Sequence, residues 1–156
     1  MIFFCRYILL FKYCETTVRI NIKFNKNTEK KMPKLISTDT APLAIGPYAQ
    51  AVCTESLLFI SGQLPVDPST GTLIPGDVSA QTHQCLKNLS AIASAAGLSL
   101  KQAVKVTVFL TDMADFPSMN AVYSHYFGAT LPARSTVQVA GLPKNAALEI
   151  EAILAY

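Results

Sequence analysis

At 156 residues, the chain is long enough for one compact domain with a core and too short for two ordinary domains. Residues 1–31 carry seven basic and two acidic side chains, whereas residues 32–156 carry six and eight. The net charge of −2 on residues 32–156 argues against a nucleic-acid partner. The whole composition is 51% hydrophobic but only 15% charged, which predicts a surface that associates with further copies of the chain in a homo-oligomer.

Residues 1–31 are an N-terminal extension, rich in Phe, Ile, Asn and Lys, that precedes the domain predicted for residues 32–156. Its apolar run is too short for a transmembrane helix, so we expect no membrane partner. Three interpretations stay open: a mitochondrial transit peptide, a disordered extension, or a stretch upstream of a natural start at Met32. Alternating basic and apolar residues favour a transit peptide, while Glu15, Glu29 and the lack of serine count against it. We predict a cytoplasmic protein, or a mitochondrial one if this segment is a transit peptide.

The cysteines and histidines do not follow the spacing of metal ligands, since no C-x-x-C pair occurs and the two histidines are far apart in the sequence. The residues concerned are Cys5, Cys14, Cys53, Cys85, His83 and His125. The sequence therefore predicts no metal site and a reducing compartment.

The domain begins with two short apolar runs, residues 49–52 and 57–61, which are joined by the polar turn 53–56. This pattern predicts an antiparallel pair of strands. Residues 65–76 are rich in Pro, Gly and Thr and predict a loop.

A first helix follows, with Asp77 as its N-cap and Gly97 as its end. Between them apolar and small residues recur every three or four positions, as on the buried side of a helix; they are Val78, Thr82, Cys85, Leu89, Ile92 and Ala96. Residues 103–110 then predict a strand, with Val104, Val106 and Val108 on its buried face.

A second helix is predicted between the start signal at Asp115 and Pro117 and the stop at Gly128. Its apolar stripe is interpreted as core rather than as an aromatic binding platform; it consists of Phe116, Met119, Tyr123, Tyr126 and Phe127. Helices alternating with strands in this way predict a mixed α+β domain whose helices cover one face of a sheet.

The last two strands, residues 134–139 and 148–155, are predicted to form a hairpin that carries Arg134 and Glu149. Arg134 is the only arginine in residues 32–156. A symmetric hairpin places Arg134 and Glu149 on the same face, offset by about 13 Å along the strands, which leaves room for a small anion and a water. Arginine grips carboxylates with two donors and glutamate transfers protons, so the pair is a candidate site for a small acid. The alternative is a surface ion pair that contributes less than about 1 kcal/mol.

Four stretches in this order resemble the Rid family, the reactive-intermediate deaminases also called the YjgF/RidA group. They are Ala44-Ile45-Gly46-Pro47-Tyr48-Ala49-Gln50, Ile60-Ser61-Gly62-Gln63-Leu64-Pro65, Met119-Asn120-Ala121-Val122-Tyr123, and Pro132-Ala133-Arg134-Ser135 with Glu149-Ile150-Glu151-Ala152. The resemblance runs from about Met32 to the C-terminus and leaves out residues 1–31.

The resemblance implies a chorismate-mutase-like α+β fold, with a mixed sheet, two helices on one face, and assembly into a trimeric barrel with clefts between subunits. It further implies a 2-iminobutanoate/2-iminopropanoate deaminase, which hydrolyses imines or enamines to 2-keto acids and ammonia. Neither a cofactor nor a metal is implied; the expected partners are a small 2-imino acid and further copies of the chain.

By the same resemblance, Arg134 holds the substrate carboxylate and Glu149 activates the attacking water and passes protons to the departing nitrogen. Glu151 shares a strand face with Glu149, but Glu149 has the family's spacing from Arg134.

The resemblance also implies a set of substrate-binding residues around this pair. Tyr48 and Asn120 are polar cleft residues, while Ser61 and Gly62 belong to a loop in which a missing Cβ lets backbone approach the ligand. Thr136 stands where many members have Cys, at a position expected to offer its backbone N–H. The linker 127–131 is shorter than in some members.

Two other functions stay open on the sequence. One is a non-enzymatic regulatory trimer that binds a small ligand, against which the presence of Arg134 counts. The other is a translation inhibitor or endoribonuclease, against which the acidic domain and the lack of a basic groove count.

Overall fold

The structure is a computed structural model that describes residues 32–156, and the interpretations of residues 1–31 lie outside the described part. Its strands are β1 (Lys34–Ile36), β2 (Ala51–Cys53), β3 (Leu57–Gln63), β4 (Ala103–Leu110), β5 (Ala133–Gln138) and β6 (Leu148–Ala155). Its helices are α1 (Val78–Ala95) and α2 (Phe116–Phe127), with 3₁₀ turns at Leu100–Gln102, Met113–Asp115 and Pro143–Asn145. Neither α1 nor α2 is long and apolar enough to cross a membrane.

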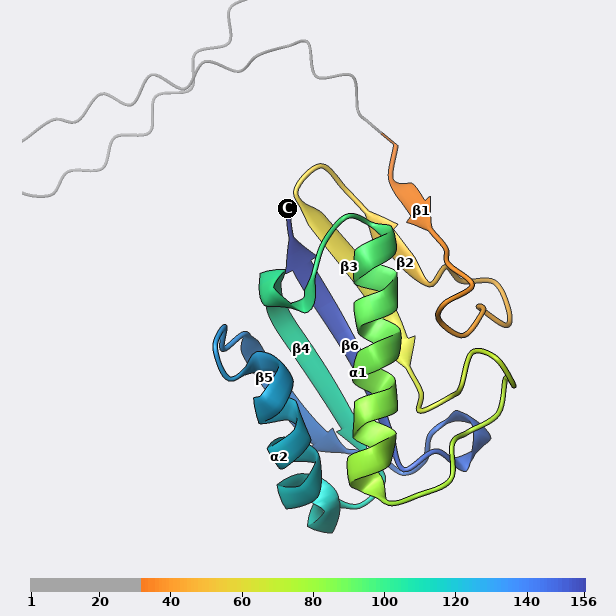
Figure 1. The fold of residues 1–156 in the computed structure, drawn as a ribbon, viewed down its shortest axis with the longest axis vertical. Coiled ribbons are helices and arrows are strands. Elements are labelled where there is room, and N and C mark those ends of the chain that lie inside the picture. The colour runs from red at the N-terminus through yellow and green to blue at the C-terminus, as the bar shows by residue number, and fades with distance from the viewer. Residues whose placement is uncertain (1–31) are drawn as a thin grey trace, which may run out of the picture. The chain divides into compact units, whose positions relative to one another are not determined.

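The six strands form one mixed sheet in the order β1-β2-β3-β6-β4-β5, and α1 and α2 both lie on one of its faces (Figure 1). All pairs are antiparallel except β4 with β5, which is parallel. A parallel pair needs a crossover, which α2 provides between these two strands. The predicted mixed α+β architecture with two helices on one face is therefore confirmed.

Local signals placed both helices correctly. The Asp77 carboxylate accepts a hydrogen bond from the Ala80 N–H at 2.9 Å, so it caps the N-terminus of α1 as predicted. α2 begins just before Pro117, and Gly128 is its C-cap.

The predicted hairpin of the last two strands is wrong. β6 lies between β3 and β4, and β5 pairs only with β4, so a whole strand separates β5 from β6. The alternation of apolar residues is the same for either partner and does not reveal which strand lies alongside.

Val104 also departs from prediction, since 46% of its surface is exposed. The pairing of β4 with β6 shifts by one residue between Ala103 and Lys105. Such a bulge reverses the alternation, so Ala103 takes the buried position instead.

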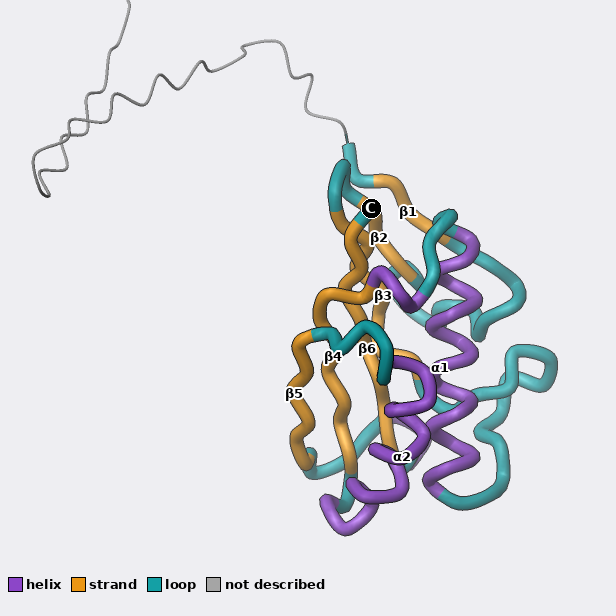
Figure 2. Tube along the Cα trace, turned by 60° about the vertical axis from the view of Figure 1, so that its left-hand side comes forward, coloured by secondary structure: helices purple, strands orange, loops and turns teal. Residues whose placement is uncertain are grey.

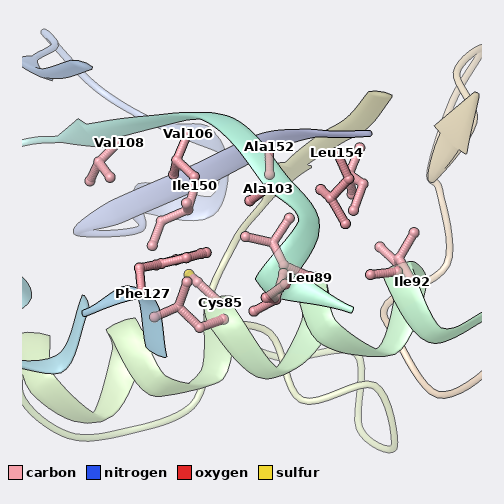
Figure 3. Close-up of a cluster of buried hydrophobic side chains, with 14 of the residues drawn as sticks. Cys85, Leu89, Ile92, Ala103, Val106, Val108, Phe127, Ile150, Ala152 and Leu154 are labelled. Carbon is pink, nitrogen blue, oxygen red and sulfur yellow. The ribbon is translucent and has the colours of Figure 1, made fainter. Parts of the chain in front are cut away.

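The core fills the space between the sheet and the two helices (Figure 3). Side chains of α1 and α2, including Cys85, Leu89, Ile92 and Phe127, pack there against β4 and β6. Burial raises the pKa of the Cys85 thiol well above its usual value, with a smaller contribution from the negative charge of Glu149, so Cys85 is a neutral core residue.

The opposite face of the sheet, which we call the open face, is covered by neither helix (Figure 2). One apolar row crosses it from strand to strand: Leu35 opposes Val52, Val52 opposes Phe59, and Phe59 opposes Ile153. Leu35 and Phe59 are 68% and 42% exposed. An exposed apolar row of this kind is typical of a surface that contacts another protein chain.

Candidate active site

Arg134 lies on the edge strand β5, opposite Val106 of β4, and therefore points to the helix side of the sheet. Its Nη1 donates a hydrogen bond to the Asn120 Oδ1 at 2.8 Å. The guanidinium carbon lies 4.4 Å from the centre of the Tyr123 ring and 5.5 Å from that of Phe116. One side of the guanidinium group is thus held by α2.

A pocket of about 280 Å³ opens beside Arg134, between α2 and the start of β5. Its walls are largely apolar and include Asn120, Tyr123, Phe127, Leu131, Pro132 and Arg134. The side-chain hydrogen bond to Asn120 occupies one of the five guanidinium donors. A pocket with apolar walls and a charged fork is suited to a small organic carboxylate.

Glu149 lies on β6 opposite Phe109, and it alternates with the buried Leu148 and Ile150, so its side chain belongs to the open face. It is half-buried. Burial raises the pKa of its carboxyl, and the negative charge of Glu151 raises it further. A carboxylate whose pKa moves toward neutrality is a better proton acceptor and donor at cellular pH.

Gly62 is the residue that makes room for Glu149. The pairing of β3 with β6 is irregular between Ile60 and Gln63, and a Cβ added at Gly62 would run into the Glu149 carboxylate, with the carboxyl carbon only 2.6 Å away. The prediction that Ser61 and Gly62 lie in a loop is wrong, since both belong to β3, and the space left by the missing Cβ of Gly62 is filled by the Glu149 side chain. The neighbouring Ser61 donates a hydrogen bond from its Oγ to the Ala49 carbonyl at 2.7 Å.

We therefore expect Gly62→Ala to displace the Glu149 carboxylate and to lower kcat of the reaction proposed below by about 100-fold. The free energy of unfolding should change by no more than about 2 kcal/mol, because Gly62 and the Glu149 side chain are both only half-buried. Steady-state kinetics and thermal denaturation measure the two quantities. Gly141→Ala is the matched control, since a Cβ added there meets nothing within 4 Å. Unchanged kcat in Gly62→Ala would show that the position of Glu149 does not matter.

Arg134 and Glu149 do not share a face, which corrects the geometry predicted for the hairpin. Glu149 opposes Phe109 and Phe109 opposes Val137, so Val137 is the β5 residue level with Glu149. Arg134 precedes Val137 by three residues, which displaces it by about 10 Å along the strand. The step from β6 to β5 spans two strand spacings, which adds about 10 Å across the sheet. Their side chains also leave the sheet in opposite directions. Within one chain the two groups cannot act on the same small molecule.

The other predicted residues also separate into two groups. Asn120 and Thr136 lie near Arg134 on the helix side; Thr136 opposes Val108, and its buried hydroxyl has no hydrogen-bond partner in the described chain. Tyr48 belongs to neither group: it is exposed in the loop between β1 and β2, the two strands at the end of the sheet furthest from β5. We call Arg134 with Asn120 and Thr136 the arginine group, and Glu149 with Ser61 and Gly62 the glutamate group.

Sequence reasoning missed the part played by Phe116 and Tyr123, which it assigned to the core alone. Tyr123 is indeed buried, but its ring also faces the guanidinium group. The signal was present as spacing, because residues 116, 120 and 123 follow one another at four and three positions and hence share one side of a helix. Within residues 32–156, no three His, Cys, Asp or Glu side chains come together as metal ligands would.

Comparison with known proteins identifies similar chains over the same region. The family model described as Endoribonuclease L-PSP matches residues 38–156. A 2-iminobutanoate/2-iminopropanoate deaminase of Salmonella typhimurium is 53% identical over 125 residues, which are 78% of this chain and 97% of that protein. A RutC family protein of Pyrococcus horikoshii is 52% identical over 78% of this chain and 97% of its own length. The crystal structure of E. coli TdcF with bound serine matches with a TM-score of 0.76 and 52% identity, over 79% of this chain and 98% of TdcF.

Proposed function

We propose a function from the premise that the chain belongs to the Endoribonuclease L-PSP family, also known as the YjgF/RidA family. The proposed function is that of a 2-imino acid deaminase acting on 2-iminobutanoate and 2-iminopropanoate. The observation that carries the proposal is the Arg134 guanidinium, held by uncharged groups at the mouth of an apolar pocket. Two findings on relatives support it. The Salmonella protein is named for this activity. The TdcF structure holds serine, an amino acid that carries a carboxylate as a 2-imino acid does.

In the proposed reaction Arg134 binds the substrate carboxylate through two N–H donors and so fixes the imine carbon. Glu149 accepts a proton from a water, whose oxygen forms a bond to that carbon as the C=N double bond becomes single. Glu149 passes this proton to the nitrogen, which then also takes up the proton of the newly formed hydroxyl as its oxygen becomes the carbonyl oxygen of the product. The C–N bond breaks, ammonia leaves, and a 2-keto acid remains. Hydrolysis of this kind consumes only water, so it requires no cofactor.

The remaining residues are assigned supporting roles. Asn120 orients the Arg134 guanidinium through its Oδ1, and Gly62 leaves the space that Glu149 fills. Thr136 offers polar groups on the same face as Arg134, and the exposed Tyr48 closes the site from another copy of the chain.

We propose that the active form is a homotrimer in which the arginine group of one copy faces the glutamate group of the next. Three features support this. The two groups lie on opposite faces of one sheet, Arg134 is on an edge strand, and the open face carries the exposed apolar row that ends at Ile153. Burying that row against another copy removes apolar surface from water, which stabilises the assembly.

RNA cleavage is the competing function, since the family description names an endoribonuclease. The net charge of −2 on residues 32–156 opposes it, because RNA binding draws most of its affinity from cations that pair with phosphates. A regulatory trimer without catalysis is the other competitor.

The test of function is to generate 2-iminobutanoate with a threonine dehydratase and to follow the release of 2-oxobutanoate with and without the protein. We expect the protein to accelerate release beyond the spontaneous reaction in water. No acceleration with 2-iminobutanoate or 2-iminopropanoate, while the folded protein still binds 2-oxobutanoate, would favour the regulatory trimer. Cleavage of RNA by the same preparation that persists in Arg134→Ala and Glu149→Gln would support a separate ribonuclease site.

Mixing two inactive variants tests whether the site is shared between copies. Arg134→Ala and Glu149→Gln chains are unfolded together in equal amounts and refolded. In a ring with random mixing, about one quarter of the interfaces combine an intact Arg134 with an intact Glu149, so we expect about one quarter of the wild-type activity. If both residues acted from the same chain, every site would carry one defect and the mixture would remain inactive.

A further inference from the structure

Arg134 is held by three side chains that all come from one side of α2. Phe116, Asn120 and Tyr123 are spaced four and three residues apart, so they form one stripe that faces β5. All three are uncharged. They restrict the guanidinium without neutralising it, whereas an aspartate or glutamate in their place would compete with a substrate carboxylate.

The three contacts differ in rigidity. Phe116 and Asn120 are half-buried, but Tyr123 is only 7% exposed and packs against the Phe127 ring at a centroid distance of 4.5 Å. The guanidinium carbon lies closer to the Tyr123 ring, at 4.4 Å, than to Phe116, at 5.5 Å. This is well within the distance at which an arginine is attracted to the face of an aromatic ring.

The hydroxyl group of Tyr123 does not account for the interaction of this residue with Arg134. It is buried and has no hydrogen-bond partner in the described chain, so it contributes nothing visible to the site. Burial raises the pKa of this phenol, the positive charge of Arg134 acting in the opposite direction, so Tyr123 remains neutral. What Tyr123 offers Arg134 is the face of its ring.

We propose that Tyr123 is a positioning residue whose ring fixes the Arg134 guanidinium flat against α2, leaving the free edge of the fork directed at the substrate carboxylate. The inference rests on the proposed role of Arg134 in binding a carboxylate. A guanidinium held over a buried ring loses less conformational freedom when a ligand binds, so the ring contributes to affinity through Arg134 as well as forming part of the pocket wall.

Binding of 2-oxobutanoate, the stable keto acid product, tests this without requiring turnover. By calorimetry on the full-length protein, we expect Tyr123→Leu to raise the Kd of 2-oxobutanoate about tenfold. Tyr123→Phe keeps the aromatic ring and should keep the Kd of wild type. In steady-state kinetics Tyr123→Leu should raise KM far more than it lowers kcat. The control is Tyr126→Leu, the same change on the same helix, at a residue whose hydroxyl lies 3.3 Å from the His83 Nδ1.

A series of fluorinated phenylalanines at position 123 separates positioning from packing and keeps the size of the ring if Tyr123→Leu does not fold. Fluorine withdraws electrons and weakens the attraction of the ring face for a cation. We expect Kd to rise stepwise with each added fluorine. A constant Kd across the series would overturn the proposal, as would equal Kd values for wild type and a folded Tyr123→Leu. Binding of 2-oxobutanoate that weakens in Tyr123→Leu, without imine hydrolysis by wild type, would refute the proposed function alone. Hydrolysis with the same KM in wild type and in a folded Tyr123→Leu would refute the role of Tyr123 alone.

Discussion

Arg134→Ala is expected to lower kcat/KM for 2-iminobutanoate by about 1000-fold. The variant loses the charged fork that we propose to bind the substrate carboxylate, and it leaves that carboxylate against pocket walls that are largely apolar. Both parameters should change, because the fork supplies affinity and also places the imine carbon for attack. Release of 2-oxobutanoate at several substrate concentrations measures kcat and KM separately.

Two further variants show whether this loss reflects recognition rather than charge or folding. Arg134→Lys keeps the charge but loses the planar fork, so it should recover only part of the activity. Lys87→Ala removes a cation from an exposed position on α1 and should behave as wild type. If Arg134→Ala is folded and as active as wild type, the carboxylate does not bind at this residue.

Features that depend on neighbouring residues were predictable from the sequence. Asp77 and Gly97 bracket α1, and Pro117 and Gly128 mark the limits of α2, because caps and breakers act within one turn of a helix. Strand β1 was not predicted, since its three residues lack the neighbouring polar turn and second apolar run that marked the equally short β2 and its partner β3 as a pair.

The order of the strands depends on contacts between distant residues and was only partly predictable. A strand, a helix and a second strand in succession favour a parallel pair, which is what β4, α2 and β5 form. Two consecutive strands near the C-terminus suggested a hairpin instead. The pairing of β5 determines which face Arg134 occupies relative to Glu149. The wrong hairpin therefore also led to the wrong prediction that Arg134 and Glu149 share a face.

The candidate residues of the site could be picked out from the sequence, whereas their geometry could not. Arg134 stands out in the sequence because it is the only arginine in residues 32–156, and Glu149 stands out because it is a charged residue within an apolar strand. Their separation into an arginine group and a glutamate group follows only from the strand order, and the ring of Tyr123 beside Arg134 follows only from the packing of α2 on β5. A core aromatic and an aromatic that positions a cation have the same pattern in sequence.

Glu149→Gln is expected to lower kcat for imine hydrolysis by about 1000-fold, while the Kd of 2-oxobutanoate changes little. The amide has nearly the same size as the carboxylate and fits beside Gly62, but it cannot accept a proton from water. In wild type, kcat should fall as the pH drops through the pKa of Glu149. Burial and the charge of Glu151 raise that pKa, so the fall should begin at a higher pH than for an ordinary glutamate, and it should be absent from the residual activity of the variant.

The same variant should be more stable than wild type at neutral pH, and this separates loss of chemistry from loss of structure. A raised pKa means that the folded state binds the proton more tightly than the unfolded state, so Glu149 costs stability once the pH rises from the unfolded value through the folded one. Glutamine removes that cost. We expect a higher Tm for Glu149→Gln at pH 7 and a difference that shrinks as the pH is lowered and wild-type Glu149 takes up its proton. A variant that is inactive and less stable at pH 7 would mean that Glu149 supports the fold. An inactive but more stable variant identifies a charge that is retained for the reaction at the expense of stability.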